Sequence, residues 1–128
     1  MTDYERLNEL QNELNAVDDK FGREDRKQLK SDIAAVMKTA EGRRFVSAIL
    51  GRSDVFGFVY HKSEGDATKL AYYTGRREAA ADIYAKVNAC APEETLMMFQ
   101  ERNAVEVKRR EQRDKILAEI NNIKNKEN

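Results

Sequence analysis

The stretch after Pro92 constrains the fold of this 128-residue chain more than any other feature. Pro92 is the only proline and suits the first turn of a helix, and neither glycine nor proline follows it before Lys124. About 33 helical residues extend roughly 50 Å, whereas a compact chain of this length has a radius of gyration of about 14 Å. This last helix must therefore either span the whole molecule or project from it.

An apolar stripe marks the N-terminal segment. Its spacing alternates between three and four residues, which is typical of a coiled-coil seam. The stripe consists of Leu7, Leu10, Leu14, Val17 and Phe21. Because the stripe spans only about two heptads, a helix over residues 1–22 that ends at Gly22 is marginal alone and needs a partner.

The apolar periodicity predicts three more helices between these two ends. They cover residues 24–38, residues 40–51 and the stretch from Thr74 to Cys90. Thr39 is a suitable N-cap for the second of them, because its hydroxyl can accept a backbone N–H of the first turn. Many alanines in the third helix allow close packing against its neighbours.

Residues 52–73 depart from the helical pattern and hold five of the ten aromatic residues. They form either a short hairpin or an irregular loop, and we favour the loop because a lone two-stranded ribbon is marginally stable. The whole pattern predicts an all-α fold with a small helical core over residues 23–104. A coiled-coil-like helix over residues 1–22 and a charged helical extension over residues 105–128 flank this core.

The charges balance overall but are separated along the chain. The net charge is zero, with 23 basic and 23 acidic residues, yet residues 1–25 carry eight acids against three bases. Residues 100–128 carry eight bases against six acids. An acidic front and a mildly basic end favour self-complementary packing or a polar partner. They do not make the strong basic footprint of a nucleic-acid-binding domain.

Residue types that support catalysis, metal binding or membrane insertion are scarce. Cys90 is the single cysteine and His61 the single histidine, which excludes an internal disulfide and a His-rich metal site. His61 lies near Glu64 and Asp66, but no nucleophile accompanies them. No apolar run approaches the length of about 18 residues that a membrane helix needs. We therefore expect a soluble, non-enzymatic protein of a reducing compartment, without cofactor or metal.

A Gly-Arg-Arg motif occurs twice, and each copy opens an apolar, helix-like stretch. The arginines are Arg43, Arg44, Arg76 and Arg77. A helix N-terminus carries about half a positive charge and favours acids, so arginine pairs there need compensation. We favour structural ion pairs with nearby acids such as Asp54, Glu64 or Asp66. The other interpretation is a phosphate or an acidic partner surface, both of which arginine binds in bidentate fashion.

The terminal helices carry the remaining candidate surfaces. The predicted assembly seam combines the N-terminal stripe with Ile116, Ile120 and Ile123 near the other end. A basic cluster before them offers phosphate contacts through Lys108, Arg109, Arg110 and Arg113. Pairing of the acidic first helix with the basic last helix, within one chain or between neighbouring subunits, would bury both parts of the seam.

Several short motifs follow one another through the middle of the chain. They are Thr39-Ala40-Glu41-Gly42-Arg43-Arg44-Phe45, Ile49-Leu50, Val55-Phe56, Gly75-Arg76-Arg77, Pro92-Glu93, Met97-Met98 and Glu101. With this series, residues 39–101 resemble a family of small tailed-bacteriophage proteins from the virion-morphogenesis region, typified by a Bordetella phage protein. Ala40 stands where the family often has proline, and Thr74 where an acid commonly precedes Gly-Arg-Arg.

The resemblance implies a non-enzymatic virion or assembly protein, with no established catalytic residues to carry over. Its implied location is the host cytoplasm during assembly and then the virion, in several copies bound to the portal, the tail or the internal ejection apparatus. Two alternatives stay open. One is a DNA-associated packaging or replication accessory that places the arginine pairs and the basic cluster on phosphates. The other is a small inhibitor of a host protein.

Overall fold

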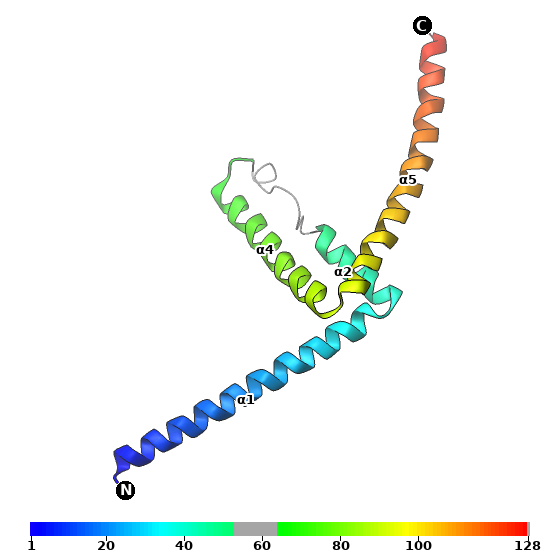
Figure 1. The fold of residues 1–128 in the computed structure, drawn as a ribbon. Coiled ribbons are helices and arrows are strands. Elements are labelled where there is room, and N and C mark those ends of the chain that lie inside the picture. The colour runs from blue at the N-terminus through cyan, green and yellow to red at the C-terminus, as the bar shows by residue number, and fades with distance from the viewer. Residues whose placement is uncertain (53–63, 128) are drawn as a thin grey trace.

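The structure is a computed structural model that describes residues 1–52 and 64–127, and helices make up nearly all of this part of the chain (Figure 1). In chain order the helices are α1 (Asp3–Met37), α2 (Ala40–Arg52), α4 (Ala67–Cys90) and α5 (Pro92–Glu127). The described residues contain no strand. The predicted all-α class is therefore confirmed.

The first helix, α1, is longer than the sequence predicts. A capping box fixes its start: the Thr2 hydroxyl accepts the Glu5 N–H at 3.2 Å, and the Glu5 carboxylate accepts the Thr2 N–H at 2.9 Å. Gly22 lies inside α1, so the predicted helix end at Gly22 is wrong, and the two helices expected over residues 1–38 are one. Glycine weakens a helix by about 1 kcal/mol relative to alanine but keeps its backbone N–H, which proline lacks.

The helix α4 also begins earlier than predicted, at Ala67 instead of near Thr74. Gly65 has a positive φ of 79° and forms part of the turn that precedes the helix. Asp66 then caps α4, because its carboxylate accepts two backbone N–H groups of the first turn at 2.8 and 3.0 Å. Because of this cap, α4 begins before the aromatic pair Tyr72 and Tyr73.

The second part of the predicted aromatic loop is therefore helical. Residues 67–73 belong to α4, and the rings of Tyr72 and Tyr73 meet edge to face with their centroids 5.2 Å apart. The loop or hairpin predicted for this stretch is wrong there. Residues 53–63, which include His61, lie outside the described residues.

A single residue, Ala91, joins α4 to α5. Pro92 occupies the first position of α5, as predicted, because that position requires no backbone N–H donor. Thr95 is 2% exposed, and its hydroxyl donates to the Ala91 carbonyl at 2.7 Å. The same hydroxyl lies 3.4 Å from the Val87 carbonyl, and this contact ties the first turn of α5 to the end of α4.

A small core lies where the helices meet. Its buried apolar residues are Met37, Val46, Leu50, Ala80, Val87, Ala91 and Met98, with Ile33 and Tyr84 packed against them. These residues come from the end of α1, from α2, from the second half of α4 and from the start of α5. We call this region the junction.

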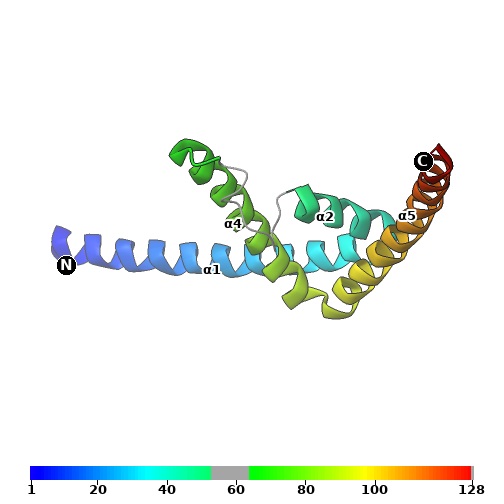
Figure 2. The ribbon, with the colours of Figure 1, turned by 90° about the horizontal axis from the view of Figure 1, so that it is seen from above.

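The outer parts of the two long helices project from the junction in different directions (Figures 1 and 2). Every residue of α1 before Gly22 and every described residue after Glu106 is exposed. We call residues 3–21 the N-terminal arm and residues 107–127 the C-terminal arm. The last helix thus projects from the molecule instead of spanning it. Among the helices of the described residues, none combines the length and the apolar character needed to cross a membrane.

Candidate interaction surfaces

The first Gly-Arg-Arg copy lies at the start of α2, as predicted, and packs against the end of α1. The Thr39 hydroxyl accepts the Gly42 N–H at 3.0 Å, which confirms Thr39 as the cap of α2. Gly42 has no room for a side chain, since a Cβ there would lie 2.7 Å from the Val36 carbonyl carbon and nearer still to its oxygen. The close approach of the two backbones therefore requires glycine.

Arg43 is buried and binds three acceptors. Its Nε donates to Glu101 Oε1 at 2.7 Å, and one terminal nitrogen donates to the backbone carbonyls of Met37 and Lys38 at 3.0 and 3.2 Å. Those carbonyls end α1, where a helix leaves carbonyls without intrahelical partners and carries partial negative charge. Arg43 thus joins α1, α2 and α5 at one point.

The acid that pairs with Arg43 is none of the three predicted from the sequence. Glu64 pairs with a lysine in the first turn of α4, Asp66 caps that helix, and Asp54 lies outside the described residues. Glu101 lies 58 positions along the chain from Arg43 and reaches it because α5 packs beside α2. A partner so distant in sequence leaves no local pattern to recognise.

Arg44, the next residue, has a different environment. Its side chain is 67% exposed and lies 3.7 Å from the Glu41 carboxylate in the same helix. A solvated pair of this kind contributes only about 0–1 kcal/mol to stability. Within one copy of the motif, Arg43 is therefore part of the scaffold and Arg44 is a surface charge.

The second Gly-Arg-Arg copy lies inside α4, so its predicted position at a helix N-terminus is wrong. Arg76 donates to the Arg52 carbonyl at 3.1 Å, and its guanidinium lies 5.5 Å from the centre of the Tyr72 ring. Arg77 is half-buried. A Cβ on Gly75 would meet no atom within 4 Å. The two copies share their sequence but not their surroundings.

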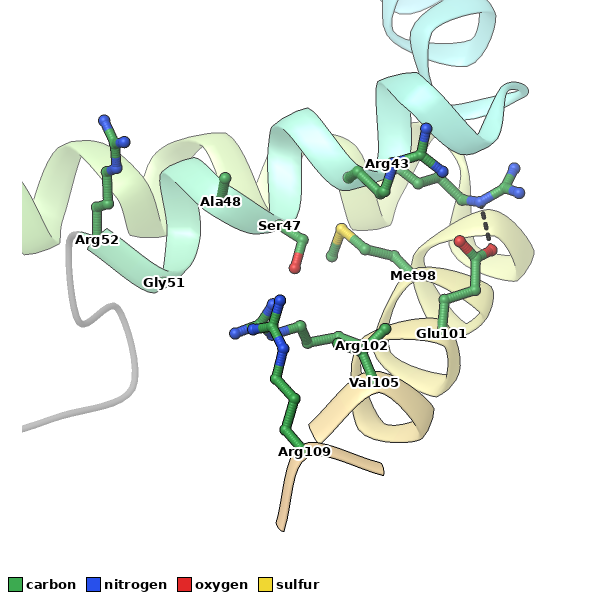
Figure 3. A pocket seen from close by; sticks show the side chains of 11 residues that line it. Arg43, Ser47, Ala48, Gly51, Arg52, Met98, Glu101, Arg102, Val105 and Arg109 are labelled. Atoms are coloured by element: carbon green, nitrogen blue, oxygen red, sulfur yellow. Dashed lines mark hydrogen bonds and ion pairs between the residues drawn. The ribbon is translucent and has the colours of Figure 1, made fainter. Parts of the chain in front are cut away.

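A groove of about 500 Å³ lies between α2 and α5 (Figure 3). The residues that line it are Arg43, Arg44, Ser47, Ala48, Gly51, Arg52, Met98, Glu101, Arg102, Val105 and Arg109. In Figure 3 the Ser47 hydroxyl points into the space between the helices, and Arg102 and Arg109 extend from α5 towards α2. We call this feature the arginine groove.

The arginine groove carries an excess of positive charge. Among the described residues that line it, Glu101 is the only acid, and it is already paired with the buried Arg43. Arg102 pairs with an acid on the next turn of α5. Arg52 and Arg109 form no ion pair with the described residues. The groove therefore offers exposed guanidinium groups beside an apolar floor.

The sequence predicts only part of this groove. Of the predicted phosphate contacts, Arg109 lines the groove, whereas Lys108, Arg110 and Arg113 are exposed and do not line it. Arg102 was missed. Its separation of seven residues from Arg109 places both on one face of α5, about two turns apart, and that spacing is readable in the sequence.

The predicted assembly seam is exposed along its length. The residues of the N-terminal stripe are 42–64% exposed, and Ile116, Ile120 and Ile123 of the C-terminal arm are 41–60% exposed. Since the arms diverge (Figures 1 and 2), the two parts of the seam do not pair within one chain. Contiguous exposed apolar surface is a common feature of protein interaction sites, so the seam is a candidate interaction surface.

Other features of the described chain offer little chemistry. Within residues 1–52 and 64–127, no group of three or more His, Cys, Asp and Glu side chains is placed to hold a metal ion. Cys90 is a half-buried free thiol at the end of α4. The chain matches no protein-family model, no curated protein and no solved structure. Its own surfaces are therefore the basis for a functional proposal.

Proposed function

We propose that this chain is a non-enzymatic assembly protein that acts in several copies, with the junction as its scaffold and the arms as contact surfaces. We place it in a tailed-bacteriophage virion, bound to the portal, the tail or the internal ejection apparatus. The resemblance of residues 39–101 to phage proteins supports that setting. The observation that carries the proposal is the exposed apolar stripe on an arm that projects away from the rest of its chain (Figure 1).

An arm of this kind gains stability from a partner. A helix without tertiary contacts is marginally stable in water, even when its residues favour helix formation. Burial of a leucine or phenylalanine side chain contributes about 1.5–3 kcal/mol. The spacing of the N-terminal stripe matches that of a coiled-coil seam, so a helix from a neighbouring subunit can cover it. Association therefore buries the stripe and stabilises the arm together.

The direct test is mass spectrometry of purified particles of the phage that encodes the chain. We expect the wild-type chain in the particles and a Leu10→Ser, Leu14→Ser variant to be excluded, since two stripe residues are lost. A Gln11→Ser, Asn15→Ser variant is the matched control, because these exposed residues lie on the same helix beside the stripe. It should enter particles normally.

Particles that lack the wild-type chain would remove the virion setting. The two alternatives then predict different binding partners. A DNA-associated accessory binds single- or double-stranded DNA at low salt and loses that affinity steeply as salt rises. If the chain inhibits a host protein, a pull-down from a lysate of uninfected host cells should recover that one protein together with the chain.

A further inference from the structure

We propose that the arginine groove of one copy binds the N-terminal arm of a second copy. This inference rests on the proposed multi-copy assembly and identifies the contact that builds it. Two surfaces of the same chain are complementary: a positively charged groove with an apolar floor, and an acidic helix with an apolar stripe.

The groove has the composition of a helix-docking site. Ala48 and Val105 supply exposed apolar surface above the buried Met98, and the guanidinium groups of Arg102 and Arg109 stand beside it (Figure 3). Its volume of about 500 Å³ accommodates several side chains from one face of a helix. A preformed groove that receives the apolar face of an amphipathic helix is a recurring mode of recognition.

The N-terminal arm presents the matching groups. With Leu7 at the first position of a heptad, Glu13 and Asp18 fall at the two positions that flank the stripe, beside Leu14 and Val17. Neither carboxylate forms an ion pair with the described residues. The arm thus carries two unpaired acids at the edges of an apolar surface, where they can meet groups on a partner.

The acids on the arm and the arginines of the groove have similar but unequal spacings along their helices. Glu13 and Asp18 are separated by about 7.5 Å along the helix axis, and Arg102 and Arg109 by about 10.5 Å, at a rise of 1.5 Å per residue. Arginine side chains are long and flexible enough to accommodate this difference, and an arginine–carboxylate pair can be bidentate. Two ion pairs at the edges of one apolar contact would fix the register of the arm in the groove.

The arm of the same chain cannot occupy the groove. Because α1 is one continuous helix, its N-terminal arm extends away from α2 and α5 (Figures 1 and 2). The occupant is therefore the arm of another copy. Each copy has one arm and one groove, so a closed assembly leaves neither unfilled. The net charge of zero, divided into an acidic arm and a basic groove, suits this exchange.

Sedimentation velocity of the full chain tests the contact through two charge reversals. The groove variant is Arg102→Glu, Arg109→Glu, and the arm variant is Glu13→Lys, Asp18→Lys. We expect each variant alone to associate about tenfold more weakly than the wild type. An equimolar mixture of the two should recover association, because a reversed arm then meets a reversed groove.

The matched control variants carry the same changes in charge at other positions of the same two helices. Arg110→Glu, Arg113→Glu alters α5 at residues that do not line the groove, and Glu9→Lys, Asp19→Lys alters the arm away from the stripe. Both controls should associate like the wild type. Circular dichroism checks that every variant is folded. The arm variant changes only exposed residues outside the junction, so its result is decisive if the groove variant does not fold.

The outcomes separate this inference from the proposal beneath it. A wild type that stays monomeric at every concentration contradicts the multi-copy assembly itself. A wild type that associates while the arm variant associates equally well overturns the groove–arm contact and leaves the assembly standing. Equal weakening by the controls also overturns it, because general charge would then explain the effect. DNA binding that the groove variant abolishes would assign the groove to phosphate instead.

Discussion

The two ends of α1 lie in opposite environments although they belong to one helix. Met37, at the junction end, is 0% exposed, and the backbone beside it leaves no space for a side chain on Gly42. Leu7, on the N-terminal arm, is 64% exposed, and that end of α1 projects away from the other helices (Figure 1). The junction satisfies its packing and hydrogen bonds within the chain, whereas the arm leaves its apolar stripe exposed. Substitutions at the junction should therefore change folding, and substitutions on the arm should change association.

The glycines of the two Gly-Arg-Arg copies give the largest expected contrast. Gly42→Ala should lower the free energy of unfolding by about 3 kcal/mol, because the new methyl group overlaps the Val36 carbonyl and forces α1 and α2 apart. Gly75→Ala should raise it by up to about 1 kcal/mol, because Gly75 lies in a helix interior with open space. Urea denaturation measures both, and equal losses would contradict the contrast.

The arginines of the first copy give the next contrast. Arg43→Met should lower the free energy of unfolding by about 2 kcal/mol, because Glu101 and two carbonyls at the end of α1 lose a charged donor. Arg44→Met is the neighbouring control and should change it by less than about 0.5 kcal/mol. A double-mutant cycle with Glu101→Gln should show coupling only for Arg43. Equal effects of the two arginine substitutions would rule out the scaffold role of Arg43.

Thr95 tests the turn between α4 and α5 with a smaller change. Thr95→Val keeps the shape of the side chain and removes the hydroxyl that donates to the Ala91 carbonyl. The free energy of unfolding should fall by about 1 kcal/mol. Thermal unfolding followed by circular dichroism measures the loss, and a midpoint equal to that of the wild type would show that this bond does not stabilise the junction.

The arm should give the smallest effect on folding. Leu14→Ser should leave the free energy of unfolding of the dilute chain within about 0.5 kcal/mol of the wild type, because Leu14 is 53% exposed and lies outside the junction. Hydrogen exchange on the wild type should show little protection in residues 3–21 at low concentration and more at high concentration. Protection of the arm that is independent of concentration would contradict this view.

The sequence predicts what local signals encode. Pro92 marks the start of α5, Thr39 caps α2, and the apolar periodicity identifies the all-α class. The predicted helix boundaries are wrong where two local signals compete. Gly22 resembles a helix end, but the surrounding residues sustain the helix through it, and the Asp66 cap sets an earlier start for α4 than the arginine motif suggests.

The candidate surfaces also differ in whether local sequence signals predict them. The N-terminal stripe is visible in the sequence because it depends on residues of one helix. The Arg43–Glu101 pair and the arginine groove depend on α2 packing beside α5, which the sequence does not encode locally. The identical Gly-Arg-Arg copies carry the same sequence signal, and only tertiary packing makes one of them buried and structural.

Sedimentation equilibrium of the full chain tests the central claim most directly. The wild type should rise above its monomer mass of 14.7 kDa as its concentration increases. The Leu10→Ser, Leu14→Ser variant should stay at that mass and keep the cooperative unfolding of the junction. A wild type that remains at 14.7 kDa at the highest concentration, or a variant that associates as strongly as the wild type, would contradict an arm built for association.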